Sequence, residues 1–203
     1  MIAIIDYGAG NLQSVKKALD YLGYENTVTQ DKEIIETASH IILPGVGSFG
    51  DAMESIRERG LEEIIKDSAS GKKPFLGICL GLQLLFEESE ESPNVKGLGV
   101  FKGRITTIPK DLGLKVPHMG WNSVSLKQND GIFKNIKNNS YFYFVHSYYL
   151  SDADEEIVAG TTEYGVKIEC AVQKGLVCAT QFHPEKSSEV GLQLLRNFME
   201  MEG

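Results

Sequence analysis

The chain has 203 residues, of which 42% are apolar and 24% are charged, and it carries a formal net charge of −8. This length and apolar content suit a substantial core, and no Pro/Gly/Ser-rich linker divides the chain, so we expect residues 1–203 to form a single domain. The 20 Lys and Arg residues are scattered along an acidic chain, which argues against a nucleic acid as partner.

The apolar stretches and the cysteines exclude further classes of protein. The longest apolar stretches have the length of a strand, and the N-terminus lacks the basic region and cleavage site of a signal peptide, so we expect a cytoplasmic protein with no membrane segment. The three cysteines, Cys79, Cys170 and Cys178, are odd in number and include no Cys-x-x-Cys pair. This argues against a disulfide framework and a zinc site, so we expect no metal.

The first apolar segments predict a strand followed by a helix. Residues 1–5 are a continuous apolar run, as expected of a strand covered on both faces in a parallel sheet, and residues 14–23 have the apolar spacing of an amphipathic helix. The glycines between them resemble a dinucleotide-binding turn only weakly, because Gln13 stands where the third glycine would be. We therefore expect no cofactor.

The next segments repeat the alternation of strand and helix. A strand and a short helix are predicted over residues 26–29 and 32–38, and a third strand over residues 40–43. A loop with three glycines among residues 45–50 follows, and then a predicted helix over residues 51–66. Glycines at such a place bring backbone N–H groups close to an anion or a developing oxyanion. An ordinary turn between a strand and a helix is the alternative interpretation.

Residues 73–86 combine a short apolar run, a cysteine between two glycines and a helix-period pattern, which predicts a strand, a tight turn and a helix. Gly77 and Gly81 remove side-chain bulk on both sides of Cys79, as a strained elbow that exposes a nucleophile requires. The N–H groups at the start of the helix favour a thiolate and are suited to hold an oxyanion. A buried structural cysteine is the alternative.

The alternation up to residue 86 predicts an α/β doubly wound sheet, mostly parallel, whose ligands bind beyond the carboxyl ends of its strands. After Glu91 the segments are strand-like with short loops, which suggests an antiparallel extension in the second half. These segments cover residues 100–108, 121–126, 141–149, 156–162, 168–173 and 176–182. A helix is predicted over residues 189–200, at the end of the chain.

His183 and Glu185 follow the last strand-like segment, with Pro184 between them. If they stand at a strand end, the period of two places both side chains on one face, where the carboxylate can orient the imidazole. Pro184 indicates a strand edge or end, where catalytic groups can be exposed. A cysteine nucleophile, a base and an orienting carboxylate in one chain favour a catalytic role over that of a lone core or surface histidine.

The glycine-flanked Cys79 and the sequence His183-Pro184-Glu185 together resemble the signature of the class I glutamine amidotransferases, whose fold is flavodoxin-like. Five further motifs resemble the glutaminase subunits of imidazole glycerol phosphate synthases, and the resemblance runs the length of the chain. These motifs cover residues 6–11, 44–49, 117–122, 143–148 and 181–187.

The resemblance implies that Cys79 attacks the side-chain carboxamide of L-glutamine, that His183 moves protons and that Glu185 holds the imidazole. It implies an oxyanion site at the backbone of Leu80, Gly45, Val46 and Gly47. It places the polar ends of glutamine near Gln83, Glu91, Ser147 and Tyr148. It places the face toward a partner at Asn11, Met119, Trp121, Tyr143 and Lys186.

Two of the implied glutamine-binding residues can also be judged from spacing. Gln83 lies four residues after Cys79, which is one helical turn on and the same face. Glu91 ends an acidic run that would usually be just a solvated face.

The implied partner is a (β/α)₈-barrel cyclase subunit, with which the chain forms a heterodimer. The cyclase receives ammonia through a channel and makes imidazole glycerol phosphate and aminoimidazole carboxamide ribotide in histidine biosynthesis. We expect the isolated chain to be nearly inactive, with the loop at residues 44–47 as the switch, because its glycines ease a backbone rotation.

Three alternatives stay open. Another class I amidotransferase, such as the glutaminase of pyridoxal phosphate synthase, would leave Trp121 and Asn122 unexplained and would be expected to have a different glycine loop. A non-catalytic scaffold of the same fold conflicts with the intact Cys79, His183 and Glu185. A cysteine peptidase is disfavoured because the chain shows no pro-segment or secretory context.

Overall fold

The computed structural model describes residues 1–203 except for the side chain of Leu112. Nine strands form a larger sheet: β1 (Ile2–Ile5), β2 (Asn26–Thr29), β3 (His40–Gly45), β4 (Phe75–Cys79), β7 (His118–Leu126), β8 (Ser140–His146), β10 (Val158–Glu163), β11 (Lys167–Lys174) and β12 (Val177–Thr180). A smaller sheet consists of β5 (Glu88–Ser89), β6 (Arg104–Thr107) and β9 (Tyr148–Ser151). The helices are α1 (Leu12–Tyr21), α2 (Lys32–Thr37), α3 (Phe49–Glu58), α4 (Glu62–Ser68), α5 (Leu80–Leu84) and α6 (Ser188–Met199). Short 3₁₀ helices span Lys110–Leu112, Gly131–Phe133 and Pro184–Lys186.

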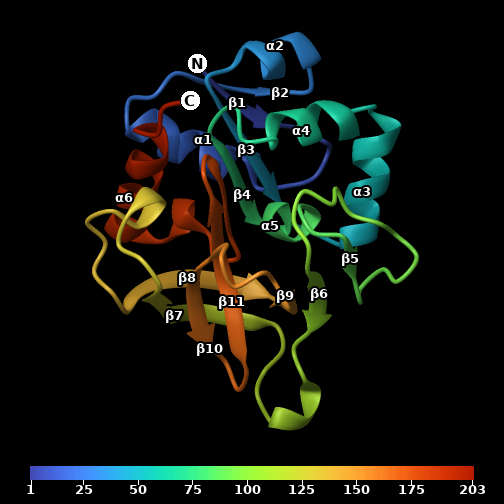
Figure 1. Ribbon diagram of the computed structural model, residues 1–203, viewed down its shortest axis with the longest axis vertical. Coiled ribbons are helices and arrows are strands. Elements are labelled where there is room, and N and C mark those ends of the chain that lie inside the picture. The colour runs from blue at the N-terminus through green and yellow to red at the C-terminus, as the bar shows by residue number, and fades with distance from the viewer.

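The larger sheet has a parallel half and an antiparallel half. Its order is β2-β1-β3-β4-β12-β11-β10-β7-β8, and Figure 1 labels all of these strands except β12. Neighbouring strands run parallel from β2 to β12, and they run antiparallel from β12 to β8. The predicted α/β sheet with an antiparallel extension in the second half of the chain is therefore confirmed.

Strand β12 departs from the prediction in a way that matters for function. Residues 176–182 were expected to belong to the antiparallel extension, but β12 pairs parallel with β4, with Thr180 opposite Ile78. The carboxyl ends of β4 and β12 therefore lie next to each other. This pairing carries the residues that follow β12 to the side of Cys79.

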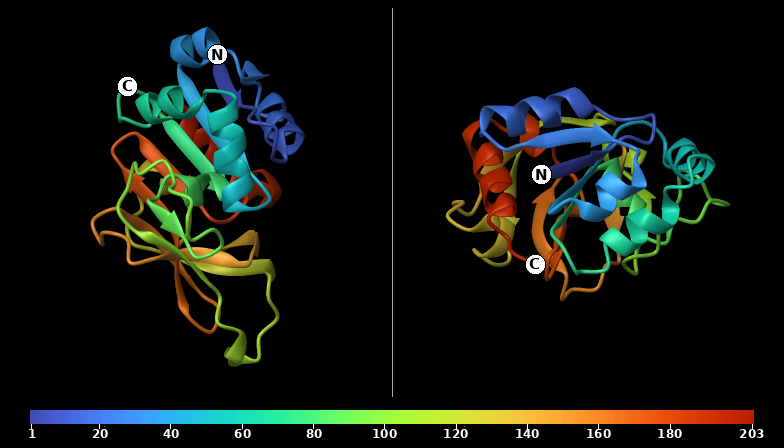
Figure 2. Two further views of the ribbon diagram at one scale, coloured as in Figure 1. Left: turned by 90° about the vertical axis from the view of Figure 1, so that its right-hand side faces the viewer. Right: turned by 90° about the horizontal axis from the view of Figure 1, so that it is seen from above.

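Helices cover both faces of the parallel half (Figure 2). Ile2 and Ile4 of β1 belong to a core cluster with buried residues of α1 and α6. Ala3 and Ile5 belong to a second core cluster with buried residues of α2, α3 and α4. Successive side chains of a strand point to opposite faces, so a strand buried on both faces must be apolar throughout. This explains the unbroken apolar run at the N-terminus.

Two segments that were predicted to be continuous are broken in the structure. The helix expected over residues 51–66 is divided into α3 and α4 because Gly60 has a φ of +63° and its N–H donates to the carbonyl of Arg57, which ends the first helix. The strand expected over residues 141–149 is divided at Ser147, and its two parts, β8 and β9, belong to different sheets.

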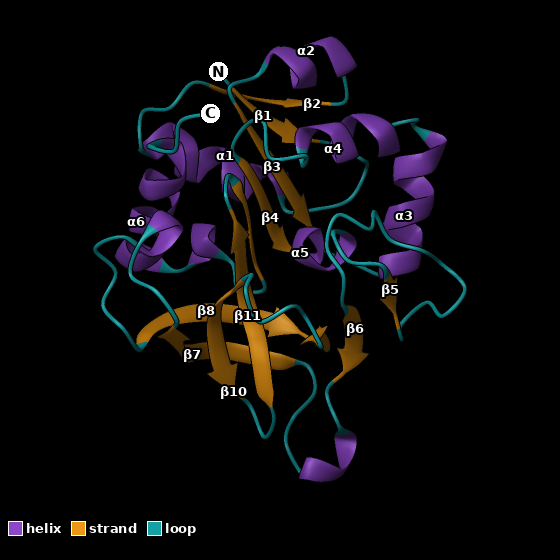
Figure 3. Ribbon diagram, viewed as in Figure 1, coloured by secondary structure: helices purple, strands orange, loops and turns teal.

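The two halves of the molecule differ in their elements (Figure 3). The α-helices gather around the parallel half, and the antiparallel half consists of strands and loops with short helical turns. Within the described residues, the structure contains no helix with the length and apolar character needed to cross a membrane.

Candidate active site

Cys79 ends β4, and α5 begins at the next residue. Its φ of 57° is unusual for a residue with a side chain, and such strained backbone is found at nucleophile elbows. The flanking glycines are required by close packing: a Cβ on Gly81 would lie 1.8 Å from the carbonyl oxygen of Leu43, and one on Gly77 would lie 2.8 Å from that of Gly81. The chain therefore turns sharply at Cys79, which stands at the carboxyl end of the central strand β4.

His183 and Glu185 are hydrogen bonded to each other, with 2.8 Å between Nδ1 and Oε1. The expected strand end is wrong: Pro184–Lys186 is a 3₁₀ helix, and this turn, not a strand period, brings the two side chains together. The expected exposure is also wrong, because the side chains of His183 and Glu185 are 2% and 1% exposed. A buried carboxylate needs such a partner.

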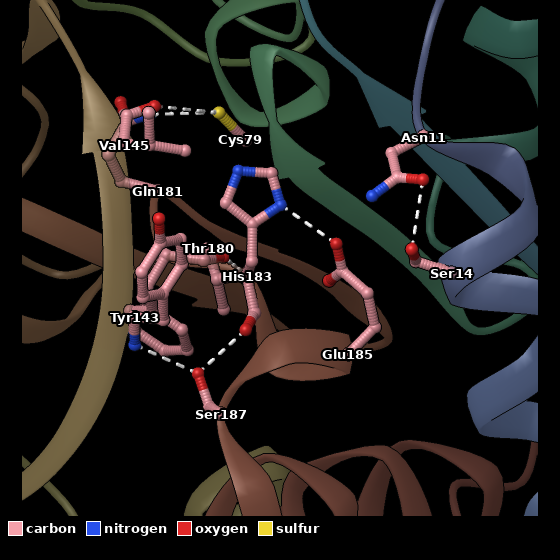
Figure 4. Close-up of polar contacts among 11 residues, drawn as sticks. Asn11, Ser14, Cys79, Tyr143, Val145, Thr180, Gln181, His183, Glu185 and Ser187 are labelled. Atoms are coloured by element: carbon pink, nitrogen blue, oxygen red, sulfur yellow. Dashed lines mark hydrogen bonds and ion pairs between the residues drawn. The ribbon is translucent and has the colours of Figure 1, made fainter. Parts of the chain in front are cut away.

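The second ring nitrogen of His183 faces the sulfur of Cys79 (Figure 4). Nε2 has no hydrogen-bond partner among the described residues, and the same holds for Oε2 of Glu185. Burial alone would lower the pKa of His183, but Cys79 and Glu185 raise it to about 10. An imidazole whose pKa is raised in this way is a strong base toward the neighbouring thiol.

The sulfur of Cys79 has two further polar neighbours. The side-chain Nε2 of Gln181 lies 3.6 Å from it and the carbonyl oxygen of Val145 lies 3.9 Å from it (Figure 4). The other two cysteines are fully buried, and burial raises the pKa of Cys170 and Cys178. Buried neutral thiols of this kind are inert.

A pocket of about 320 Å³ opens beside Cys79. It is lined by eight residues that the resemblance assigns to the nucleophile, the oxyanion or the glutamine: Val46, Gly47, Cys79, Leu80, Gln83, Glu91, Ser147 and Tyr148. A larger hollow of about 490 Å³ includes Leu176 and Val177, at the amino end of β12. The smaller pocket is the better candidate because ligands of such sheets bind at the carboxyl ends of the strands.

Hydrogen bonds within the chain hold the side chains of Gln83 and Glu91 in place. Gln83 Nε2 donates to the carbonyl of Tyr148 at 3.1 Å and to Oε1 of Gln181 at 3.0 Å. Glu91 Oε2 accepts from the backbone N–H of Phe49 at 2.7 Å, at the start of α3. These contacts orient both side chains at the wall of the pocket.

The glycine loop contributes only in part to the pocket. Gly45 is the last residue of β3 and stands opposite Cys79, and a Cβ there would lie 2.3 Å from the hydroxyl of Tyr7. Val46 and Gly47 line the pocket, and Val46 is 40% exposed. Gly47 has a φ of +106°, which favours glycine.

Four of the five residues assigned to a partner face lie together on β7, on β8 and after β12. Met119 and Trp121 are 63% and 51% exposed. The rings of Trp121 and Tyr143 are 6.2 Å apart, and Lys186 Nζ lies 5.9 Å from the centre of the Tyr143 ring. We call Met119, Trp121, Tyr143 and Lys186 the aromatic cluster. The fifth, Asn11, stands directly before α1, where its Oδ1 accepts from Ser14.

Sequence reasoning gave no role in the site to Gln181 or to the histidine pair of His118 and His146. Nδ1 of His118 and Nε2 of His146 are 2.9 Å apart, and His146 also lines the pocket. Gln181 belongs to the motif at residues 181–187, but an amide in a strand pattern carries no chemical signal of its own. Strand pairing creates these contacts, and the local pattern does not reveal which strands pair.

Comparisons with known proteins identify the family. Residues 3–201 match the family model described as "Glutamine amidotransferase class-I". The chain therefore belongs to the class I glutamine amidotransferases. Two solved structures share the fold: a glutamine amidotransferase (TM-score 0.77, 22% identity, 98% of each chain covered) and PurLQS from Thermotoga maritima (TM-score 0.73, 21% identity, 98% of this chain and 96% of that one).

Curated relatives narrow the comparison, and the three below bear the name imidazole glycerol phosphate synthase subunit HisH. The relative from Caldanaerobacter subterraneus subsp. tengcongensis is 50% identical over 201 residues, covering 99% of this chain and 98% of its own. The relative from Moorella thermoacetica is 52% identical over 200 residues (98% and 94%). The relative from Methanococcus maripaludis, designated HisH 1, is 49% identical over 205 residues (99% and 100%).

Proposed function

We propose that this chain is the glutamine-hydrolysing subunit of an imidazole glycerol phosphate synthase and supplies ammonia to a cyclase subunit in histidine biosynthesis. Identities of 49–52% over nearly the full length of relatives with that subunit name support the proposal. The observation that carries the chemistry is the buried contact between His183 Nδ1 and Glu185, which leaves Nε2 turned toward Cys79. The proposal includes two further expectations. Residues 1–203 form one domain, and the protein is located in the cytoplasm.

The proposed reaction begins with the thiol proton of Cys79 already on Nε2 of His183, whose pKa is raised to about 10. The thiolate attacks the carboxamide carbon of glutamine, and the new oxyanion accepts from the N–H of Leu80, with help from the loop at residues 45–47. The tetrahedral intermediate collapses as His183 gives its proton to the leaving nitrogen, which departs as ammonia. Water, deprotonated by His183, then attacks the thioester and releases glutamate and the thiolate.

The pocket supports recognition of glutamine by groups that the protein has already oriented. The carboxylate of Glu91 suits the α-ammonium group, and Gln83, Ser147 and Tyr148 offer polar atoms to the other end of the amino acid. A pocket of about 320 Å³ is of the size expected for a small ligand.

The proposed partner solves a chemical problem. Ammonia released into water near neutral pH is protonated and loses its nucleophilic lone pair, so hydrolysis is useful only beside an acceptor. The exposed aromatic cluster supports docking of a cyclase next to the pocket, because Met119 pairs with Val145 and Val145 lines the pocket. If the free subunit must spend about 3 kcal/mol to rotate the loop at residues 44–47 into place, its turnover falls about a hundredfold or more.

The test is glutaminase activity of the purified chain, with and without the cyclase subunit and its nucleotide ligand, for wild type, Cys79→Ala and Cys178→Ala. We expect activity chiefly in the complex, none in Cys79→Ala, and normal activity in Cys178→Ala, which removes a buried thiol far from the pocket. A glutamine-analogue electrophile should label Cys79 alone. Turnover of glutamine by Cys79→Ala would refute the assignment of the nucleophile. Equal rates for the free chain and the complex would refute the gating.

A further inference from the structure

Gln181 is a buried amide that touches the reacting sulfur. Its side chain is fully buried in the residues just before His183, and its Nε2 lies 3.6 Å from Cys79 Sγ. Figure 4 shows the amide and the histidine approaching the sulfur from different directions. Burying an amide costs free energy unless its atoms are hydrogen bonded, so each contact of this side chain requires an explanation.

The neighbours of Gln181 decide which way its amide points. Gln83 Nε2 donates both to the Tyr148 carbonyl, which can only accept, and to Oε1 of Gln181. Because Gln83 presents a donor, Gln181 must present its oxygen to Gln83, and its N–H group is therefore turned toward Cys79. The same Tyr148 carbonyl also lies 2.9 Å from Nδ1 of His146. The direction of donation is thus fixed from the pocket wall to the sulfur.

An N–H donor benefits some states of the sulfur more than others. A thiol can donate its own proton, and the Val145 carbonyl lies 3.9 Å away as acceptor. A thiolate can only accept, and a donor to a charged acceptor forms a stronger hydrogen bond than a donor to a neutral sulfur. The contact from Gln181 is therefore worth most when the sulfur carries negative charge, that is, before it attacks and when it leaves the acyl group.

We propose that Gln181 is a further catalytic residue of this site, whose N–H, oriented by Gln83, stabilises Cys79 as a thiolate. The inference rests on the proposed glutaminase function. In the first half-reaction the proton of Cys79 goes to His183 Nε2, a C–S bond forms, and the C–N bond breaks as that proton leaves with ammonia. In the second, a C–O bond to water forms, the C–S bond breaks, and the electron pair returns to the sulfur that Gln181 faces.

The first test compares wild type with Gln181→Met and Gln181→Glu in the complex with the cyclase subunit. Gln181→Met keeps the length of the side chain and removes the donor, and Gln181→Glu keeps the shape and turns an acceptor toward the sulfur. We expect kcat for glutamine to fall about 10- to 100-fold in Gln181→Met, as the loss of a hydrogen bond to a charged group predicts, with a larger fall in Gln181→Glu. The KM for glutamine should change less than kcat, because Gln83 keeps its hydrogen bond to the Tyr148 carbonyl.

The second test needs no substrate. The rate at which iodoacetamide alkylates Cys79, and the thiolate absorbance in the ultraviolet, should fall in Gln181→Met by a similar factor, because alkylation needs the thiolate but not the glutamine pocket. Gln193→Met is the control for the amide-to-thioether change, since the Gln193 amide is partly buried and donates to Asn197 on α6, away from the site. Circular dichroism checks that each variant is folded. If Gln181→Met does not fold, the same measurements are made on Gln181→Glu.

The outcomes distinguish a failure of the role proposed for Gln181 from a failure of the proposed glutaminase function. Equal alkylation and equal kcat in wild type and Gln181→Met would overturn the role of Gln181, and so would an equal fall in Gln193→Met. A wild-type complex that hydrolyses no glutamine would refute the proposed function, and slower alkylation in Gln181→Met would then still support the contact with the sulfur.

Discussion

Gly81, two residues after the nucleophile, determines how closely α5 packs on the sheet. A Cβ at this position would lie 1.8 Å from the oxygen and 2.9 Å from the carbon of the Leu43 carbonyl. These are backbone atoms of a central strand, so the clash can be relieved only by moving α5 away from β3. Because Leu80 precedes Gly81 and is assigned to the oxyanion, such a movement would also disturb the site.

We therefore expect Gly81→Ala to lower the free energy of unfolding by about 3 kcal/mol and to abolish most glutaminase activity. Overpacking a core costs about 1–3 kcal/mol or more, whereas alanine gains at most about 1 kcal/mol in helix propensity. The net effect on the free energy of unfolding is therefore destabilising. Urea denaturation of the isolated chain measures the change. Gly160→Ala is the control, because its new Cβ would meet the Val124 side chain at 3.0 Å and a side chain can shift. Equal stabilities of the two variants would contradict the argument.

At this scale the sequence identifies residues whose chemistry is distinctive. A cysteine between glycines and a His-Pro-Glu sequence are recognisable because few other roles need those types at that spacing. The contact between His183 and Glu185 was predicted, but from a strand period that the 3₁₀ helix replaces. Gln181 could not be predicted in the same way, because an amide acquires a role only from neighbours 98 and 102 residues away in the chain.

At the scale of elements, local patterns predict a strand or a helix well where each segment is followed by its packing partner. The first three strands, with α1 and α2, were predicted from apolar spacing because each strand and the next helix form one local unit. The parallel pairing of β12 with β4 was not predicted. It joins segments about a hundred residues apart, and apolar spacing carries no information about which strand becomes a neighbour.

Strands β7 and β8 are joined on their buried face by the histidine pair. His118 stands opposite His146 in the strand register, and the ring of His118 stacks on those of Phe144 and Tyr164, with ring centres 4.8 and 4.0 Å apart. Burial lowers the pKa of His118 to about 4 and, as the largest cause, that of His146 to about 3. Both rings are therefore neutral in the folded protein near pH 5, where unfolded histidines, with a pKa of about 6.5, are charged.

This difference predicts that the protein loses stability as the pH falls. Between pH 6.5 and 5 the unfolded state binds protons that the folded state does not, so the free energy of unfolding decreases, by up to about 2 kcal/mol for each histidine. His183 does not cause this loss: its pKa of about 10 keeps it protonated in the folded state, so its stabilising contribution is present below pH 6.5 and is lost only at higher pH.

The measurement is urea denaturation of wild type and His118→Gln at pH 6.5 and at pH 5. We expect the loss of stability on acidification to be smaller in His118→Gln by up to about 2 kcal/mol. Near pH 8 His118 is neutral in both states, so any difference between the proteins there reflects packing and serves as the reference. Equal losses in the two proteins would show that His118 is protonated in the folded state.

At the scale of the whole molecule, both halves of the sheet contribute residues to the candidate site. Cys79 comes from the parallel half, and Val145 comes from β8 at the far edge of the antiparallel half. The two halves therefore enclose the pocket together. Three residues of the aromatic cluster lie on β7 and β8 beside this pocket, so an occupant of the cluster would sit close to the point where ammonia is released.

Trp121 is the residue of the cluster whose loss should weaken docking most. It is 51% exposed, and large exposed aromatic side chains are preferred anchors of protein interfaces. We expect Trp121→Ala to weaken binding of the cyclase subunit about 30-fold or more, which corresponds to about 2 kcal/mol, by calorimetric titration. Tyr21→Ala is the control, because Tyr21 is 74% exposed at the end of α1 and lies outside the cluster. Alkylation of Cys79 in the isolated chain should be the same in wild type and both variants, since neither side chain contacts the sulfur. If Trp121→Ala binds the cyclase as tightly as Tyr21→Ala does, the partner face lies elsewhere on the molecule.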